Sequence, residues 1–106
     1  MVLNISSRRG SLNLQAQGAA KGSGCSYSYR ISKAAQNMLT LCLADDLEPQ
    51  GIRVAAIHPG RLKTSMAPKD AALSPQQSAE KLGSIILANR ITSRDFLCME
   101  SGYLPW

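Results

Sequence analysis

The chain has 106 residues, of which 44% are hydrophobic and 18% charged, and these values predict one small globular domain. Twelve Lys and Arg against seven Asp and Glu leave a formal net charge of +5. The basic residues are spread along the chain, and only one Trp, three Tyr and one Phe accompany them. A nucleic-acid surface needs clustered cations and stacking aromatic rings, so nucleic acid is not an expected partner.

The cysteines at 25, 42 and 98 are far apart, and the only histidine is His58. This set lacks the paired spacing of a zinc site or a disulfide framework, so no metal is expected. No apolar run approaches the roughly 20 residues that span a bilayer, and residues 1–5 lack the basic flank of a signal peptide. The composition therefore excludes a membrane protein, a disulfide scaffold and a zinc finger, and it predicts a cytoplasmic location.

The predicted elements alternate between strands and helices along the chain. Residues 2–5 form a short apolar strand, and 10–28 form a long loop rich in Gly and Ser. A helix follows at about 28–47, since apolar residues recur there on one face and no Gly or Pro interrupts them. Pro49 and Gly51 end that helix. Residues 52–57 are a second buried strand, which breaks at the next Pro-Gly pair, at 59–60.

The second half of the chain contains another helix and another strand. Ser74, Pro75 and Gln77 form an N-cap, a proline at the first helical position and a capping box for a helix that reaches Asn89. A short strand is expected at 95–99. Strands joined through helices indicate an α/β fold with a doubly wound parallel sheet of about three strands and two main helices. Two helices can scarcely cover both faces of such a sheet.

Tyr29 and Lys33 stand four residues apart at the start of the first long helix, so their side chains share one helical face. A cation beside a phenol favours the phenolate, and a tyrosine in that setting can exchange a proton near neutral pH. Taken alone, the same pair is also typical of an exposed lysine beside a half-buried tyrosine.

Polar residues follow two of the predicted strands at the sheet edge where open α/β sheets bind ligands. Ser6 and Ser7 could polarise a carbonyl oxygen, or they could satisfy loop backbone groups. After the next strand, Pro59-Gly60 allows a flat ligand to approach the backbone and Thr64 offers a hydroxyl, although an ordinary turn has the same residues. His58 is expected to pack or to form hydrogen bonds and not to act as a base.

Asn-Ile-Ser-Ser, Tyr-x-x-x-Lys and Pro-Gly-x-x-x-Thr occur here in one order, and together they resemble the short-chain dehydrogenase/reductase family, in its carbonyl-reductase-like branch. Residues 27–39 and 102–106 strengthen the resemblance. It implies that Ser7, in preference to Ser6, polarises a substrate carbonyl and that Tyr29 exchanges the proton. It also implies that Lys33 holds the nicotinamide ribose hydroxyls of NAD or NADP. The residues that it implies for the nicotinamide loop are Pro59, Gly60, Leu62 and Thr64.

A Gly-x-x-x-Gly-x-Gly spacing occurs at residues 18–24, but it lies within the predicted loop and does not directly follow a strand, as the family's phosphate-binding turn does; the 106 residues contain no Asn-Ala-Gly turn and no match for the family's helix asparagine. We therefore expect one partial domain, residues 1–106, equivalent to the carboxyl-terminal half of a Rossmann-like fold. The substrate that the resemblance implies is a small carbonyl compound or alcohol. We expect the chain alone to have little or no activity on it. The alternative is a non-catalytic interaction module that forms a homo-oligomer, or pairs with a full-length relative, through the helix at 28–47.

Overall fold

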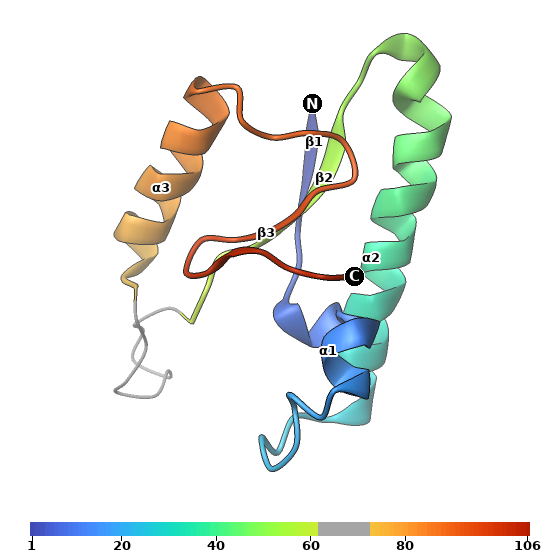
Figure 1. Ribbon diagram of the computed structural model, residues 1–106, viewed down its shortest axis with the longest axis vertical. Helices are drawn as coiled ribbons and strands as arrows, with labels where there is room; N and C mark the ends of the chain where they lie inside the picture. The colour runs from blue at the N-terminus through green and yellow to red at the C-terminus, as the bar shows by residue number, and fades with distance from the viewer. Residues whose placement is uncertain (62–72) are drawn as a thin grey trace.

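The computed structural model describes residues 1–61 and 73–106 (Figure 1). Two residues of the predicted nicotinamide loop, Leu62 and Thr64, lie outside the described residues. The elements follow one another in the order β1 (Val2–Ile5), η1 (Arg8–Gly10), α1 (Leu12–Ala16), α2 (Tyr27–Leu47), η2 (Glu48–Gln50), β2 (Val54–His58), α3 (Pro75–Leu87), β3 (Phe96–Cys98) and β4 (Gly102–Tyr103).

The strands form one four-stranded sheet in the order β1-β2-β3-β4. Strands β1 and β2 pair in parallel, with Val2 opposite Val54, and β2 pairs in parallel with β3. The predicted α/β class and its parallel sheet are thus confirmed. Strand β4 adds an antiparallel pair of residues that the sequence pattern did not predict, because a two-residue strand is too short to show alternation.

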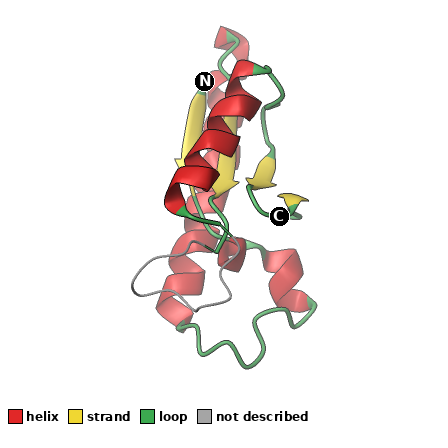
Figure 2. Cartoon of the chain, turned by 90° about the vertical axis from the view of Figure 1, so that its left-hand side faces the viewer, coloured by secondary structure: helices red, strands yellow, loops and turns green. Residues whose placement is uncertain are grey.

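Helices α2 and α3 lie on opposite faces of the sheet, as both ribbon views show (Figures 1 and 2). On the α3 side the core contains Ala55, Ile57, Leu97 and Met99, and Leu82 and Ile85 pack against it. On the α2 side the contacts are more polar, and Asn4 Nδ2 donates to Thr40 Oγ1 at 2.9 Å. Each helix therefore covers one face, which is the doubly wound arrangement. The cover by α2 is one-sided, since Ile31, Met38 and Leu39 on it are more than half exposed.

Local capping sets the ends of both long helices. The Ser26 side chain accepts from Tyr29 N, so α2 begins at Tyr27, one residue before the predicted start. The capping box of Ser74 and Gln77 is present and is confirmed. Because these caps use residues within one helical turn, the sequence identifies them directly. No helix within the described residues is both long and apolar enough to cross a bilayer.

The expectation of a loop over residues 10–28 is wrong at its beginning, where the helix α1 forms. Ser11 caps α1 by accepting from Leu14 N at 3.0 Å. The same Ser11 hydroxyl donates to Pro105 O at 2.7 Å, and Leu12 N donates to Trp106 O at 2.6 Å. The end of the chain therefore stabilises α1, and a contact over more than 90 residues leaves no local signal.

Candidate active site

Three polar segments meet at one edge of the sheet, because the carboxyl ends of parallel strands lie together. Ser6 and Ser7 follow β1, residues 58–61 end β2 and continue from it, and residues 98–100 end β3. The amino-terminal part of α2, which contains Tyr29 and Lys33, is tied to this edge by Gln36. Its Nε2 donates to Ile5 O at 2.9 Å.

Tyr29 and Lys33 lie together on α2. The Lys33 Nζ atom is 5.7 Å from the centre of the Tyr29 ring, and Tyr29 is 43% exposed. Within residues 1–61 and 73–106, the Tyr29 hydroxyl has no hydrogen-bond partner and Lys33 pairs with no carboxylate; Lys33 Nζ donates to Gln36 Oε1 at 3.3 Å. The exposed Tyr29 and the half-buried Lys33 beside it can therefore meet a ligand from solvent.

The two serines after β1 have different partners. Ser6 Oγ donates to Asn37 Oδ1 at 2.6 Å in a buried bond, which joins β1 to α2. Ser7 is buried, and its Oγ accepts from Arg9 N at 3.1 Å as the N-cap of η1. The capping bond uses Ser7 Oγ as an acceptor and leaves its own O–H available as a donor. No hydrogen bond among the described residues joins Ser7 to Tyr29.

Gly10 lets η1, and with it the Ser7 segment, approach α2 closely. A Cβ atom at residue 10 would lie 2.7 Å from Lys33 O and 2.8 Å from Asn37 Nδ2. These atoms belong to the turn of α2 that carries Lys33. The lack of a side chain at Gly10 therefore determines how near the segment of Ser7 comes to the helix of Tyr29 and Lys33.

We expect Gly10→Ala to lower the free energy of unfolding by about 1–3 kcal/mol, since the new methyl group clashes with helix backbone that cannot rotate away. Chemical denaturation measures this change. Gly83→Ala on α3 is the matched control, because nothing lies within 4 Å of its added Cβ. That variant should be more stable by about 1 kcal/mol, from helix propensity alone. Equal effects of the two substitutions would contradict the close contact.

His58 is the last residue of β2 and is buried. Its Nε2 accepts from Arg8 Nε at 3.3 Å. Burial lowers the pKa of His58 from 6.5 to about 4, and the Arg8 guanidinium adds to this effect. The imidazole is thus neutral at pH 7, and its role as a hydrogen-bonding residue agrees with the expectation from the sequence.

Cys98 at the end of β3 is the second group that Arg8 contacts, at 3.7 Å between Nη2 and Sγ. Burial acts to raise the pKa of Cys98. Hydrogen bonds from Ser101, from the Glu100 backbone and from Arg8 outweigh that effect and lower the pKa. Arg8 therefore links β1 to the ends of β2 and β3.

The Pro59-Gly60 turn has the backbone geometry that only glycine adopts easily. Gly60 has a φ of +93°, and a Cβ there would lie 3.3 Å from Leu73 Cδ1 and 3.4 Å from Glu100 Cβ. Ser78 Oγ on α3 donates to Pro59 O at 2.7 Å. The turn therefore packs against Leu73, Glu100 and Ser78, which hold its backbone at the edge of the sheet.

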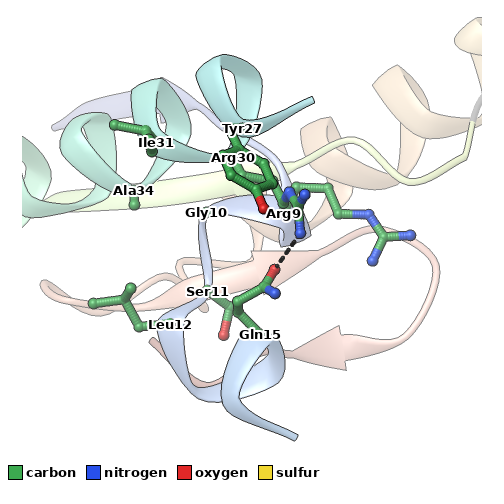
Figure 3. A pocket seen from close by; sticks show the side chains of 9 residues that line it. All are labelled: Arg9, Gly10, Ser11, Leu12, Gln15, Tyr27, Arg30, Ile31 and Ala34. Atoms are coloured by element: carbon green, nitrogen blue, oxygen red, sulfur yellow. Dashed lines mark hydrogen bonds between the residues drawn. The ribbon is translucent and has the colours of Figure 1, made fainter. Parts of the chain in front are cut away.

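A separate hollow of about 340 Å³ lies between η1, α1 and α2 (Figure 3). Arg30 and Gln15 are hydrogen-bonded across it, with 3.1 Å between Nη1 and Oε1. Its α2 residues, Ile31 among them, lie on roughly the opposite side of the helix from Tyr29 by helical periodicity. This hollow is therefore distinct from the edge that holds Tyr29 and Lys33. Within the described ranges, no three His, Cys, Asp or Glu residues gather as metal ligands.

The motifs in the sequence did not identify Arg8, Gly10 or Glu100 as parts of this edge. Gly10 stands three residues after Ser7, and that spacing is the one local signal that could have drawn attention to it. Arg8 and Glu100 are ordinary charged residues in sequence terms. Their partners are more than 35 residues away along the chain, so only the tertiary structure reveals them.

Comparison with known proteins extends these observations. The family model described as Enoyl-(Acyl carrier protein) reductase matches residues 2–96. The C-signal protein of Myxococcus xanthus is 35% identical over 99% of this chain, and the match covers 60% of its own length. The chain thus spans less than two thirds of that relative.

Two solved structures are also similar to the chain. Carbonyl reductase Sniffer of Drosophila melanogaster has a TM-score of 0.78 and 31% identity, and the match covers 98% of this chain and 40% of Sniffer. A short-chain dehydrogenase/reductase from Burkholderia multivorans with bound NADP has a TM-score of 0.74 and 28% identity, over 98% of this chain and 43% of that one. With its doubly wound sheet and its matches in sequence and structure, the chain belongs to the short-chain dehydrogenase/reductase family.

Proposed function

We propose that this chain supplies the catalytic half of an NAD(P)-dependent oxidoreductase that interconverts a small carbonyl compound and its alcohol. The observation that carries the proposal is the Tyr29–Lys33 pair, with the Lys33 ammonium 5.7 Å from the centre of an exposed tyrosine ring. Tyr29 would donate its hydroxyl proton to the carbonyl oxygen during reduction and accept one during oxidation. Lys33 places a positive charge beside the ring of the phenol that would give up the proton.

The described residues fit the nicotinamide half of a dinucleotide. Lys33 offers three N–H donors and pairs with no carboxylate in the described chain, so it can hold ribose hydroxyls. Gly60 is buried, and its positive φ turns the backbone directly after the half-buried Pro59, where the flat ring is proposed to lie. When bound, the cofactor supplies or accepts the hydride. Leu62 and Thr64 complete the proposed loop by family resemblance.

The buried Ser7 is proposed to donate its O–H to the substrate oxygen. Its capping bond with Arg9 N holds the side chain in one orientation, and a pre-oriented donor stabilises developing negative charge without reorganisation. Ser6 is bonded to Asn37 and supports the scaffold. In this proposal Ser7 polarises the substrate carbonyl, Tyr29 exchanges the proton and Lys33 binds the ribose hydroxyls.

NADPH is the first cofactor to test, because the solved relative from Burkholderia multivorans has NADP bound. Gly18, Gly22 and Gly24 follow α1 and not a strand, so they do not form the strand-turn-helix site that holds a dinucleotide phosphate, and we expect little turnover from the purified chain by itself. Joined in frame to the amino-terminal part of the Sniffer carbonyl reductase, the chain should oxidise NADPH in the presence of small aldehydes, ketones or quinones. Absorbance at the nicotinamide band and recovery of the alcohol product measure this reaction.

Binding of NADPH to the chimera, followed by its fluorescence, shows whether the cofactor site has assembled. A folded chimera that binds NADPH but reduces no member of the carbonyl panel would contradict the proposed function. Turnover by the isolated chain would leave the chemistry intact and contradict the expectation that it needs the remaining length of its relatives.

A second candidate function is association through α2. Ile31, Met38 and Leu39 on this helix are 66%, 59% and 53% exposed, and apolar side chains grouped in this way are typical of an interaction surface. If α2 is such a surface, Met38→Glu should shift sedimentation of the chain toward the monomer, whereas Leu87→Glu on α3, at a residue that is 89% exposed, should not. Identical sedimentation of wild type and both variants would contradict this candidate.

A further inference from the structure

The turn after β2, residues 59–61, is held from two sides. From α3, the buried Ser78 hydroxyl donates to Pro59 O at 2.7 Å. From the end of β3, Glu100 accepts hydrogen bonds from both the backbone and the guanidinium of Arg61. The backbone N–H of Arg61 donates to Oε2 at 3.2 Å, and its guanidinium Nη2 donates to Oε1 at 2.7 Å. One carboxylate therefore accepts hydrogen bonds from both the main chain and the side chain of the same turn residue.

The Glu100 carboxylate is in a setting that keeps it ionised and in place. Its side chain is 16% exposed, and Arg8 Nη2 lies 3.8 Å from Oε2. The hydrogen bonds from Arg61 lower the pKa of Glu100 to about 2. Hydrogen bonds to an ionised acceptor are about twice as strong as neutral ones. The bond to the Arg61 backbone thus persists throughout the neutral range.

Glu100 also links the turn to the segment of the proposed carbonyl-polarising serine. Arg8 is the residue after Ser7, and its guanidinium contacts Glu100 from the β1 side while Arg61 contacts it from the β2 side. In addition, Glu100 packs against the turn itself, because a Cβ atom added to Gly60 would lie 3.4 Å from Glu100 Cβ. The ends of β1, β2 and β3 are thereby joined at one acidic side chain.

We propose that Glu100 is a positioning residue that fixes the 59–61 turn relative to the Ser7 segment, so that the turn is pre-formed for a nicotinamide ring. The inference rests on the proposed function, which assigns Pro59 and Gly60 to that ring. Glu100 itself touches no reacting atom. It acts through the Arg61 backbone on one side and through Arg8 on the other.

The backbone bond is the part of this arrangement that carries the inference. The Arg61 side chain is 51% exposed, and exposed ion pairs contribute little. Loss of the acceptor breaks the bond from the Arg61 main chain to the β3 side, whatever happens to the guanidinium. A substitution that removes the acceptor should therefore differ from one that removes only the charge.

The test uses the 106-residue chain and three variants. Glu100→Ala removes the acceptor, and Glu100→Gln keeps a neutral acceptor of the same length. Glu48→Ala is the control. Glu48 forms an exposed ion pair with Arg94, with 3.5 Å between Oε2 and Nη2, and this pair lies outside the candidate site. In E100A the Arg61 amide should exchange with deuterium about 10-fold to 100-fold faster, with a smaller change in E100Q and none in E48A. Unchanged exchange in E100A would overturn the proposal.

Binding of nicotinamide mononucleotide, followed by NMR titration below the melting temperature, separates positioning from general support of the fold. The dissociation constant should rise at least roughly 10-fold in E100A, the typical effect of one lost charge-assisted bond. E100Q should recover part of that loss, and E48A should match the wild type. Binding that E100A leaves unchanged would contradict this inference alone. Failure of the wild-type chain to bind the mononucleotide would contradict the proposed function as well.

Discussion

Tyr29→Phe in the chimera is expected to lower the rate of carbonyl reduction by roughly 100-fold to 10,000-fold, the usual contribution of a general acid. The substitution removes one hydroxyl from a ring that is 43% exposed, so the packing of α2 is unaffected. NADPH binding, measured by fluorescence, should be unchanged because the Lys33 ammonium remains. The loss should therefore appear in kcat far more than in KM for NADPH.

Tyr27→Phe is the matched control for this experiment. Tyr27 stands two residues earlier on the same helix and also has a cation over its ring, with the Arg30 guanidinium 5.3 Å from the ring centre. It is 77% exposed and is not part of the Tyr-x-x-x-Lys pair. Turnover should survive this substitution. If both variants keep full activity, or both lose it equally, the assignment of Tyr29 as the proton donor is wrong.

The same variants separate catalysis from association. If the chain works only as an interaction module, Tyr29→Phe should leave its partner binding intact and there should be no turnover to lose. The two functions therefore predict different results from one pair of substitutions, with sedimentation and NADPH oxidation as the two measurements.

The second large effect concerns acid stability and His58. We expect the free energy of unfolding to fall by about 3 kcal/mol between pH 6.5 and pH 4, because the pKa of His58 is lowered from 6.5 to about 4. Above pH 6.5 the imidazole is neutral in both the folded and the unfolded chain, so it does not change the free energy of unfolding. As the pH drops through this window, the unfolded chain binds a proton that the folded chain excludes. The folded state therefore loses stability until pH 4, where folded His58 is protonated too.

Urea denaturation at several pH values between 7 and 5 measures this slope before most carboxylates titrate. His58 is the only histidine, so His58→Gln, which keeps an acceptor for Arg8, should flatten the curve in that range. Glu100 does not interfere, since its lowered pKa causes loss of stability only as the pH falls below its normal value of 4.5 toward about 2. A slope that persists in His58→Gln would show that another group causes it.

Features that depend on neighbouring residues were accessible from the sequence. The capping box at Ser74 and the 21-residue helix α2 use contacts within one or two turns, and periodicity and cap residues reveal them. The Tyr29–Lys33 pair shares a helical face for the same reason. The buried strand β2 was also recognisable, because a run of apolar residues between turn signals has few other interpretations. Its observed start at Val54 is two residues later than predicted.

The remaining features needed the folded chain. Helix α1 depends on hydrogen bonds that Ser11 and Leu12 donate to the carbonyl oxygens of Pro105 and Trp106, and strand β4 depends on pairing with β3. Glu100 becomes a link between three strands only when the parallel sheet brings Arg8 and Arg61 beside it.

The amino-acid order alone thus determined the fold class, the long helices and the residue types that could exchange a proton. Local propensities and helical periodicity act over a few residues, so they can be recognised directly in the sequence. The tertiary structure decided which charges meet, that His58 is buried beside Arg8, and that Gly10 brings η1 against the turn of Lys33. Burial and ion pairing depend on distances in space between residues far apart in the chain, and no local pattern encodes those distances.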